Sequence, residues 1–158
     1  MKRIPNPPKA KYLMGSMRHM GYSFSDAIAD VMDNSVSASC TTIRLIFPSN
    51  AEDIYVGILD DGHGMSKQEL LRAMCYGSQA NEKERSENDL GRFGLGMKSA
   101  SLSQCRKMTV ISKKDGEVSA YRWDYDEIKS QGQRGDWAVL ELNNSEIREQ
   151  YCFDELEA

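Results

Sequence analysis

Apolar residues follow a helical spacing in some segments of this chain and a two-residue alternation in others. Near the N-terminus they recur three to four positions apart, at Leu13, Met14, Met17 and Met20. This spacing predicts a helix over 12–20 that ends at Gly21. A second helix is expected from Ser25, interpreted as its N-cap, to about Val36. The residues expected on its inner side are Ile28, Val31, Met32 and Ser35.

Alternating segments rich in β-branched residues predict five strands, over 42–47, 54–59, 108–112, 118–123 and 137–142. The segment Lys114-Asp115-Gly116 predicts the turn between the third and fourth strands. Between the second and third strands, Ser66 and Glu69 form a capping-box pattern that predicts a helix with an apolar stripe at Leu70, Leu71 and Met74. Helices that pack against one mixed sheet with mostly antiparallel neighbours form a two-layer α/β sandwich with helices on one face, and this is the fold class we expect.

Composition narrows the function classes only moderately. The chain has 158 residues, of which 40% are hydrophobic and 28% charged, as in one ordinary globular domain. Its net charge of −4 argues against a broad basic face for nucleic acid but allows a local patch. No apolar run reaches the ~18 residues of a membrane helix and no signal-peptide pattern is present, so we expect a cytoplasmic protein without membrane contact.

The four cysteines, Cys40, Cys75, Cys105 and Cys152, are far apart in the sequence. They form no C-x-x-C pair, and the chain has only two histidines, which argues against a zinc site. We therefore expect free, buried thiols in a reducing compartment.

Two polar residues lie one turn apart on the second predicted helix. Asp30 and Asn34 are four positions apart and project from the same face. A carboxylate can accept a proton from water, and a carboxamide oxygen can hold Mg²⁺, which takes only one or two protein ligands beside phosphates and water. The pair suggests a magnesium–phosphate site, and a polar solvent-facing helix surface is the structural alternative.

A short acidic segment follows the second predicted strand. Asp60 ends this strand, where its carboxylate can accept a hydrogen bond from an exocyclic amine such as that of adenine. Gly62 and Gly64 let a flat ligand approach the backbone, and Met65 can pack against the ligand's face. The alternative is an ordinary Asp-Gly turn. His63 is expected to be exposed and without a chemical role.

The stretch from Gly91 to Ala100 is rich in glycine and leads into a predicted helix over 97–104. Uncovered backbone N–H groups and the positive end of the helix dipole attract phosphate. Met97 is inserted before Lys98 relative to the P-loop pattern, and no early buried strand precedes the loop, so a Walker-type NTPase is rejected. The polar segment 77–89 is either a solvated linker or a lid over a ligand.

Three motifs now stand in one order: D-x-x-D-N on a helix, D-D-G-H-G-M after a strand, and G-R-F-G-L-G-M-K-S-A before a helix. From about Tyr12 to Asn143 the chain resembles the GHKL superfamily of ATPases, which includes gyrase B, the ninety-kilodalton heat-shock chaperones, histidine kinases and MutL. It is most similar to microrchidia-type and related prokaryotic members. The resemblance implies a Bergerat ATP-binding fold, with Mg²⁺-ATP between the helices and one face of the sheet.

The resemblance also implies roles for individual residues. Asp30 falls where many members carry a glutamate general base, and Asn34 would hold Mg²⁺. Asp60 would accept a hydrogen bond from the adenine amine, and Gly64 and Met65 would line the adenine pocket. Residues 77–93 would form the lid. The phosphates would be surrounded by the glycine-rich stretch, which consists of Gly91, Arg92, Phe93, Gly94, Leu95, Gly96, Met97 and Lys98.

Two departures from the family bear on activity. Asp30 is one methylene shorter than glutamate, so it reaches the attacking water less well or through a second water. Ala138 stands near where members often carry a threonine beside the adenine, and it removes one hydrogen bond. We therefore expect ATP binding with slow hydrolysis to ADP and phosphate.

The expected organisation is an N-terminal arm over 1–11, a GHKL ATP-binding domain over 12–143 and an acidic tail over 144–158 that leads to a further domain. In the family, ATP closes the lid and dimerises the module, and a following domain often supplies a catalytic lysine. We expect an ATP-dependent homodimer in a longer DNA-linked or defence-type ATPase, in which any DNA contact is made through other domains. Weak turnover is expected of this chain alone.

Two other functions stay open. A non-catalytic nucleotide sensor or interaction module would bind ATP without using Asp30 as a base. A histidine protein kinase shares the fold, but it needs a dimerising helical segment with a phosphoacceptor histidine upstream. Only about 25 residues precede the D-N helix, and His19 is a poor acceptor.

Overall fold

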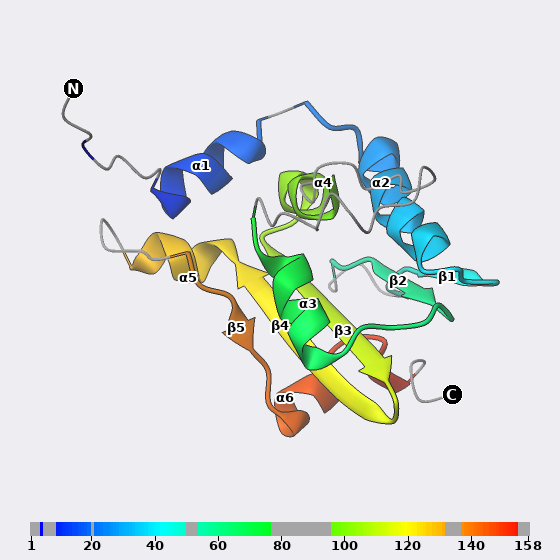
Figure 1. The fold of residues 1–158 in the computed structure, drawn as a ribbon. Coiled ribbons are helices and arrows are strands. Elements are labelled where there is room, and N and C mark those ends of the chain that lie inside the picture. The colour runs from blue at the N-terminus through cyan, green and yellow to red at the C-terminus, as the bar shows by residue number, and fades with distance from the viewer. Residues whose placement is uncertain are drawn as a thin grey trace.

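The computed structural model describes residue 4 and residues 9–19, 21–49, 54–76, 96–131 and 137–154. Within these ranges the helices are α1 (Ala10–Met17), α2 (Phe24–Ser37), α3 (Lys67–Met74), α4 (Gly96–Gln104), α5 (Tyr125–Ser130) and α6 (Asn144–Arg148) (Figure 1). The strands are β1 (Ile43–Ile46), β2 (Gly57–Asp60), β3 (Lys107–Lys114), β4 (Glu117–Asp124) and β5 (Leu140–Glu141). The α/β class is confirmed.

The described strands form two antiparallel sheets, β1-β2 and β3-β4-β5, where the sequence predicted one mixed sheet. In the β1-β2 sheet, Ile43 pairs with Asp60. β3 and β4 form a hairpin whose two-residue turn, Asp115-Gly116, has φ angles of 52° and 83°, as a type I′ turn requires. The segment after β2 reaches β3 through a side chain, because the Met65 N–H donates to the Ser112 hydroxyl and not to a backbone carbonyl.

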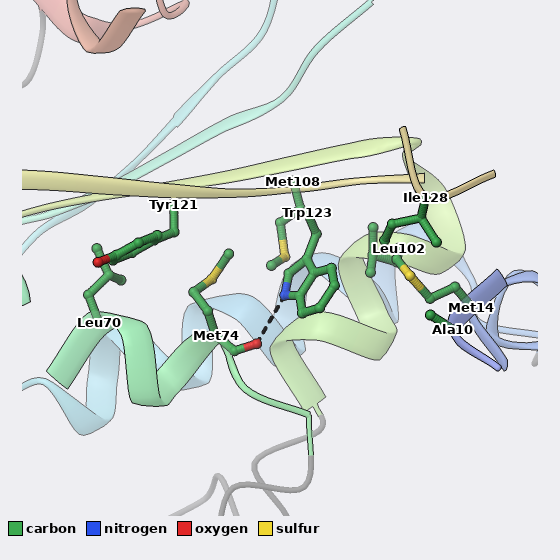
Figure 2. Packing of buried hydrophobic residues seen from close by; sticks show 9 residues of the cluster. All are labelled: Ala10, Met14, Leu70, Met74, Leu102, Met108, Tyr121, Trp123 and Ile128. Carbon is green, nitrogen blue, oxygen red and sulfur yellow. Dashed lines mark hydrogen bonds between the residues drawn. The ribbon is translucent and has the colours of Figure 1, made fainter. Parts of the chain in front are cut away.

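The main hydrophobic core lies between β3-β4 and four helices, α1, α3, α4 and α5. Figure 2 shows the indole of Trp123, on β4, pointing at the end of α3, where its Nε1 donates to the Met74 carbonyl at 3.0 Å. This bond satisfies a carbonyl that the end of α3 leaves without an intrahelical partner. The buried members of the core are Ala10, Met14, Leu70, Met74, Leu102, Met108, Tyr121, Trp123 and Ile128.

A second cluster covers the opposite face of the same sheet. Ala120 alternates with Tyr121 along β4, and it packs with Leu142, Ile147 of α6 and Phe153. Successive residues of a strand point to opposite faces, so α6 and the segment after it cover the face that the main core does not. α6 therefore adds a helix to the second face of the sheet, where the sequence predicted helices on one face.

Element boundaries differ from the prediction where a side chain other than the expected one caps a helix. α2 begins at Phe24 because Ser23, and not Ser25, accepts from the backbone N–H of Asp26. The capping box of Ser66 and Glu69 is confirmed. α5 was not predicted; Asp124, the last residue of β4, caps it. β5 is also shorter than the predicted 137–142.

None of the four cysteines, all within the described residues, forms a disulfide bond, as predicted. The prediction that they are buried is wrong, because Cys75 is exposed and the other three are half-buried. None of the described helices is both long enough and apolar enough to span a membrane.

Candidate functional site

Asp60 lies at the exposed end of β2, with its carboxylate fixed by two donors. The Ser35 hydroxyl of α2 donates to Oδ2 at 2.8 Å, and the Gly62 N–H donates to Oδ1 at 3.0 Å. A side chain at Gly62 would not fit, because its Cβ would lie 2.8 Å from that of Ala38. The two bonds orient the carboxylate, and the one from Ser35 holds the last turn of α2 against the end of β2.

The next residue, Asp61, anchors the connection between α2 and β1. It accepts hydrogen bonds from the backbone N–H groups of Thr41 and Thr42, at 2.7 and 2.9 Å, and from the Thr41 hydroxyl at 2.6 Å. These donors favour the charged carboxylate and lower the pKa of Asp61 to about 2. Asp61 was not among the site residues predicted from the sequence; the features that could have indicated it were a second aspartate beside Asp60 and the two threonines at 41 and 42.

Gly64 and Met65 seat the segment after β2 on β3. Gly64 has a φ of +64°, and a Cβ there would lie 2.1 Å from the Lys113 carbonyl oxygen. The Met65 N–H donates to the Ser112 hydroxyl at 2.8 Å, and Met65 packs against the main core. His63 is exposed, as predicted. The glycine at position 64 is therefore required by the close approach of two backbones.

Asp30 and Asn34 lie on the same helix as Ser35. The Asn34 amide nitrogen donates to the Asp30 carbonyl at 2.8 Å, which leaves the Oδ1 oxygen as the atom able to ligate a cation. Asn34 is exposed and Asp30 is half-buried. Interaction with the neighbouring Asp30 carboxylate raises the pKa of the Tyr22 hydroxyl. The Ser35–Asp60 bond places this helix segment next to the end of β2.

Lys98 lies in the first turn of α4 and is buried against the end of α3. Only 2% of its surface is exposed, and its Nζ donates to the Ala73 carbonyl at 2.6 Å and lies 5.8 Å from the centroid of the Tyr76 ring. Burial lowers the pKa of Lys98 to about 8. Gly96 begins α4, and Met97 packs against the main core.

The structure therefore brings Asp60 and Gly62 together with the Ser35 turn of α2, and it holds Lys98 against α3. The remaining predicted site residues, Gly91, Arg92, Phe93, Gly94 and Leu95, and the expected lid over 77–93 lie outside the described residues. The described part offers an oriented carboxylate, an amide oxygen and a second carboxylate. These are the groups that an adenine amine, a magnesium ion and an attacking water require.

Residues 22–157 match the profile of the family described as "Histidine kinase-, DNA gyrase B-, and HSP90-like ATPase". The chain belongs to this family. The match covers most of the chain and includes every candidate site residue, so the resemblance to the GHKL superfamily is confirmed.

Individual GHKL proteins are similar at moderate identity. The chain is 31% identical over 94 residues to "ATPase morc-1" of Caenorhabditis elegans, covering 60% of this chain and 11% of that protein. It is 31% identical over 121 residues to "Chaperone protein HtpG" of Halalkalibacterium halodurans, covering 68% and 19%. It is 30% identical over 102 residues to "DNA mismatch repair protein MutL" of Colwellia psychrerythraea, covering 62% and 15%. The chain thus spans less than a fifth of each of these relatives.

Proposed function

We propose that this GHKL module binds Mg²⁺-ATP and hydrolyses it slowly. The observation that carries the proposal is the Asp60 carboxylate, held by the Ser35 hydroxyl and the Gly62 N–H at the exposed end of β2. Each carboxylate oxygen accepts one bond within the protein and retains a lone pair for an incoming donor. The exocyclic amine of adenine is such a donor, whereas guanine presents a carbonyl at the corresponding ring position.

Asn34 and Asp30 are the groups proposed for the phosphate end of the ligand. Asn34 would ligate Mg²⁺ through Oδ1, since its amide nitrogen is bonded to the helix backbone. When bound, Mg²⁺ neutralises charge on the phosphates. Asp30 would take the proton of the attacking water, and the neighbouring Tyr22 hydroxyl, whose pKa the Asp30 carboxylate raises, would help to orient it. Because the aspartate is short, we expect slow turnover.

The start of α4 is proposed to bind the phosphates through the backbone at Gly96 and Met97 and through Lys98. Lys98 donates to the Ala73 carbonyl in this structure, so it would have to leave α3 to reach a phosphate. The glycine-rich residues 91–95 and a lid over 77–93 complete the proposed site. Closure of this lid and ATP-dependent dimerisation are proposed from the family, and sedimentation velocity with and without a non-hydrolysable ATP analogue would test dimerisation.

The decisive experiment is calorimetric titration of the chain with ATP and Mg²⁺, followed by a phosphate-release assay. We expect Asp60→Asn to weaken binding at least tenfold, about 1.4 kcal/mol, because the amide presents a donor to the adenine amine. Asn34→Ala should weaken Mg²⁺-ATP selectively while leaving metal-free ATP unchanged. Asp30→Ala should bind normally and abolish release. Asp33→Ala, which alters an exposed carboxylate on the same helix, is the matched control.

Three results would contradict parts of this proposal. Absence of ATP binding by the wild-type chain would overturn it entirely. Tight binding with equal, negligible phosphate release by wild type and Asp30→Ala would favour a nucleotide sensor. Incorporation of labelled phosphate into the chain at His19 would favour a histidine kinase.

The wider setting of the module is also proposed and not shown. The relatives named "ATPase morc-1" and "DNA mismatch repair protein MutL" are much longer than this chain, which supports a place in a larger DNA-linked or defence-type ATPase. We propose that residues 12–143 form the ATP-binding domain, with 1–11 as an arm and 144–158 as a connection to further domains. The intracellular location stays a prediction.

A further inference from the structure

An open pocket of about 470 Å³ lies between α1, α5 and the start of β3, and basic side chains dominate its wall. α1 and α5 lie side by side in Figure 1, at the end of the molecule away from α2 and β1. The charged residues that line the pocket are Lys11, Arg18, Arg106 and Lys129, and His19 lines it as well. No aspartate or glutamate is among the described residues that line it.

One acidic residue beside the pocket offsets part of this charge. Asp126 forms a two-point ion pair with Arg106, with Nε–Oδ2 at 2.9 Å and Nη2 bonded to Oδ1. Lys11, Arg18 and Lys129 still contribute three positive charges in a chain whose net charge is −4. The charge of the protein is therefore distributed unevenly, and this wall is a local cationic region.

The arginines are held in place before any ligand binds. Arg18 donates from Nη1 to the carbonyls of Leu102 and Cys105, at 3.2 and 2.5 Å. Its guanidinium also lies 5.6 Å from the Tyr125 ring centroid, and that of Arg106 lies 5.4 Å from the same ring. The two bonds to the carbonyls use only Nη1 of Arg18. Its other donors, Nε and Nη2, therefore belong to a side chain that is already fixed, which lowers the entropy lost on binding an anion.

We propose that this basic pocket binds a compact ligand with two or more phosphate groups. Arginine and lysine together suit phosphate, because guanidinium matches its geometry and ammonium supplies a mobile point charge. The volume is within the range of small-molecule sites. A long nucleic acid fits less well, since it needs a continuous basic track and is repelled by the net negative charge of the rest of the chain.

The pocket is distinct from the proposed ATP site. Arg18 binds carbonyls at the C-terminal end of α4, whereas Gly96, Met97 and Lys98 form its N-terminal end. A helix of nine residues is roughly 13 Å long at 1.5 Å per residue. The length of α4 therefore separates a ligand in the basic pocket from the proposed phosphate end of ATP. Binding in this pocket does not depend on the proposed function.

Sodium tripolyphosphate is the probe for this proposal, titrated without Mg²⁺ or nucleotide into the ¹⁵N-labelled chain. We expect saturable amide shifts at residues 11–19 and 125–130. The variant Lys11→Glu/Lys129→Glu should weaken binding at least tenfold, because it reverses two charges while leaving the Arg18 bonds to α4 intact. The matched control Arg72→Glu/Arg148→Glu, at exposed positions on α3 and α6, should change affinity less than threefold.

Several outcomes would overturn the proposal. These are no saturable shifts, shifts confined to residues 60–65 and 96–98, or equal weakening by the control variant. A single-stranded 20-nucleotide DNA is a competing probe. If it binds more tightly than tripolyphosphate and loses binding in the Lys11→Glu/Lys129→Glu variant, the ligand class is nucleic acid and not an oligophosphate. Tighter binding of a hexaglutamate peptide would replace it with an acidic protein segment.

Discussion

At the scale of single residues, the site depends on places where no side chain fits. Gly64 combines a left-handed φ of +64° with a Cβ position 2.1 Å from the Lys113 carbonyl oxygen. Gly116 has a similar φ of +83° but no atom within 4 Å of its Cβ position. A side chain at Gly116 would therefore meet backbone strain alone, whereas a side chain at Gly64 would meet both backbone strain and steric overlap.

Substitution of both glycines by alanine should measure this difference. We expect Gly116→Ala to lower the free energy of unfolding by about 1 kcal/mol, the cost of the left-handed conformation alone. Gly64→Ala should cost at least ~2 kcal/mol more, because the segment must also move away from β3. Urea denaturation checks both values. Equal losses in the free energy of unfolding for the two variants would show that the close contact with the Lys113 carbonyl is relieved without an energetic cost.

At the scale of elements, α3 is tied to other elements at both ends. At its start, Glu69 completes the capping box with Ser66 and accepts from the Lys114 ammonium of β3 at 2.9 Å. At its end, the carbonyls of Ala73 and Met74 accept from Lys98 and Trp123. These contacts fix the position of α3, which follows the Asp60 segment in the chain. Their loss should therefore also disturb the geometry of the candidate site.

The start of α3 should make stability depend on pH. Bonds from Lys114 and Ser66 lower the pKa of Glu69 from 4.5 to about 2. Its stabilisation is therefore complete above pH 4.5 and is lost as pH falls toward 2. Glu69→Gln retains the cap but cannot titrate, so urea denaturation between pH 2 and 7 should show a flatter profile for it. Asp61 and Asp126, whose pKa values are also lowered, contribute to the remaining slope, and Asp61→Asn is the comparison.

The end of α3 should show a conflict between stability and binding. Burial lowers the pKa of Lys98 from 10.5 to about 8. Between these two pH values the unfolded chain binds more protons than the folded one. The free energy of unfolding therefore rises with pH in this range. Lys98→Met should remove this rise and leave stability at pH 7 unchanged or higher. ATP affinity should fall at least tenfold. Unchanged ATP affinity would remove Lys98 from the proposed site.

At the scale of the whole molecule, one sheet separates two cores. The larger core joins α1, α3, α4 and α5 to β3-β4, and the smaller one joins α6 to the other face. Trp123 is central to the larger core, with 2% of its surface exposed, and its ring lies 5.1 Å from that of Tyr76. Trp137 joins the same aromatic group from an exposed position, with 37% of its surface accessible.

The two tryptophans should therefore differ in their contribution to stability. Trp123→Phe removes the bond to the Met74 carbonyl and leaves a space in the core, so we expect a loss of about 2–4 kcal/mol in the free energy of unfolding. Trp137→Phe should cost less than about 1.5 kcal/mol, because much of its surface faces solvent. Chemical denaturation followed by far-UV circular dichroism checks both. A larger effect at Trp137 would contradict the assignment of the core.

Local chemistry in the sequence determined the family, the α/β class, the capping box of α3 and the β3-β4 turn. The capping box and the turn each depend on residues a few positions apart, such as Ser66 with Glu69 or Asp115 with Gly116, and the family depends on three short motifs in a fixed order. The motif residues Asp30, Asn34 and Asp60 were also found this way, although their functional roles stay predictions.

Only the tertiary structure decided which distant groups meet. It paired Ser35 with Asp60, buried Lys98 against Ala73, divided the strands into two sheets and placed α6 on the second face. It also gathered Lys11, Arg18, Arg106 and Lys129 around one pocket. These contacts depend on how elements far apart in the chain pack, and neither periodicity nor spacing carries that information.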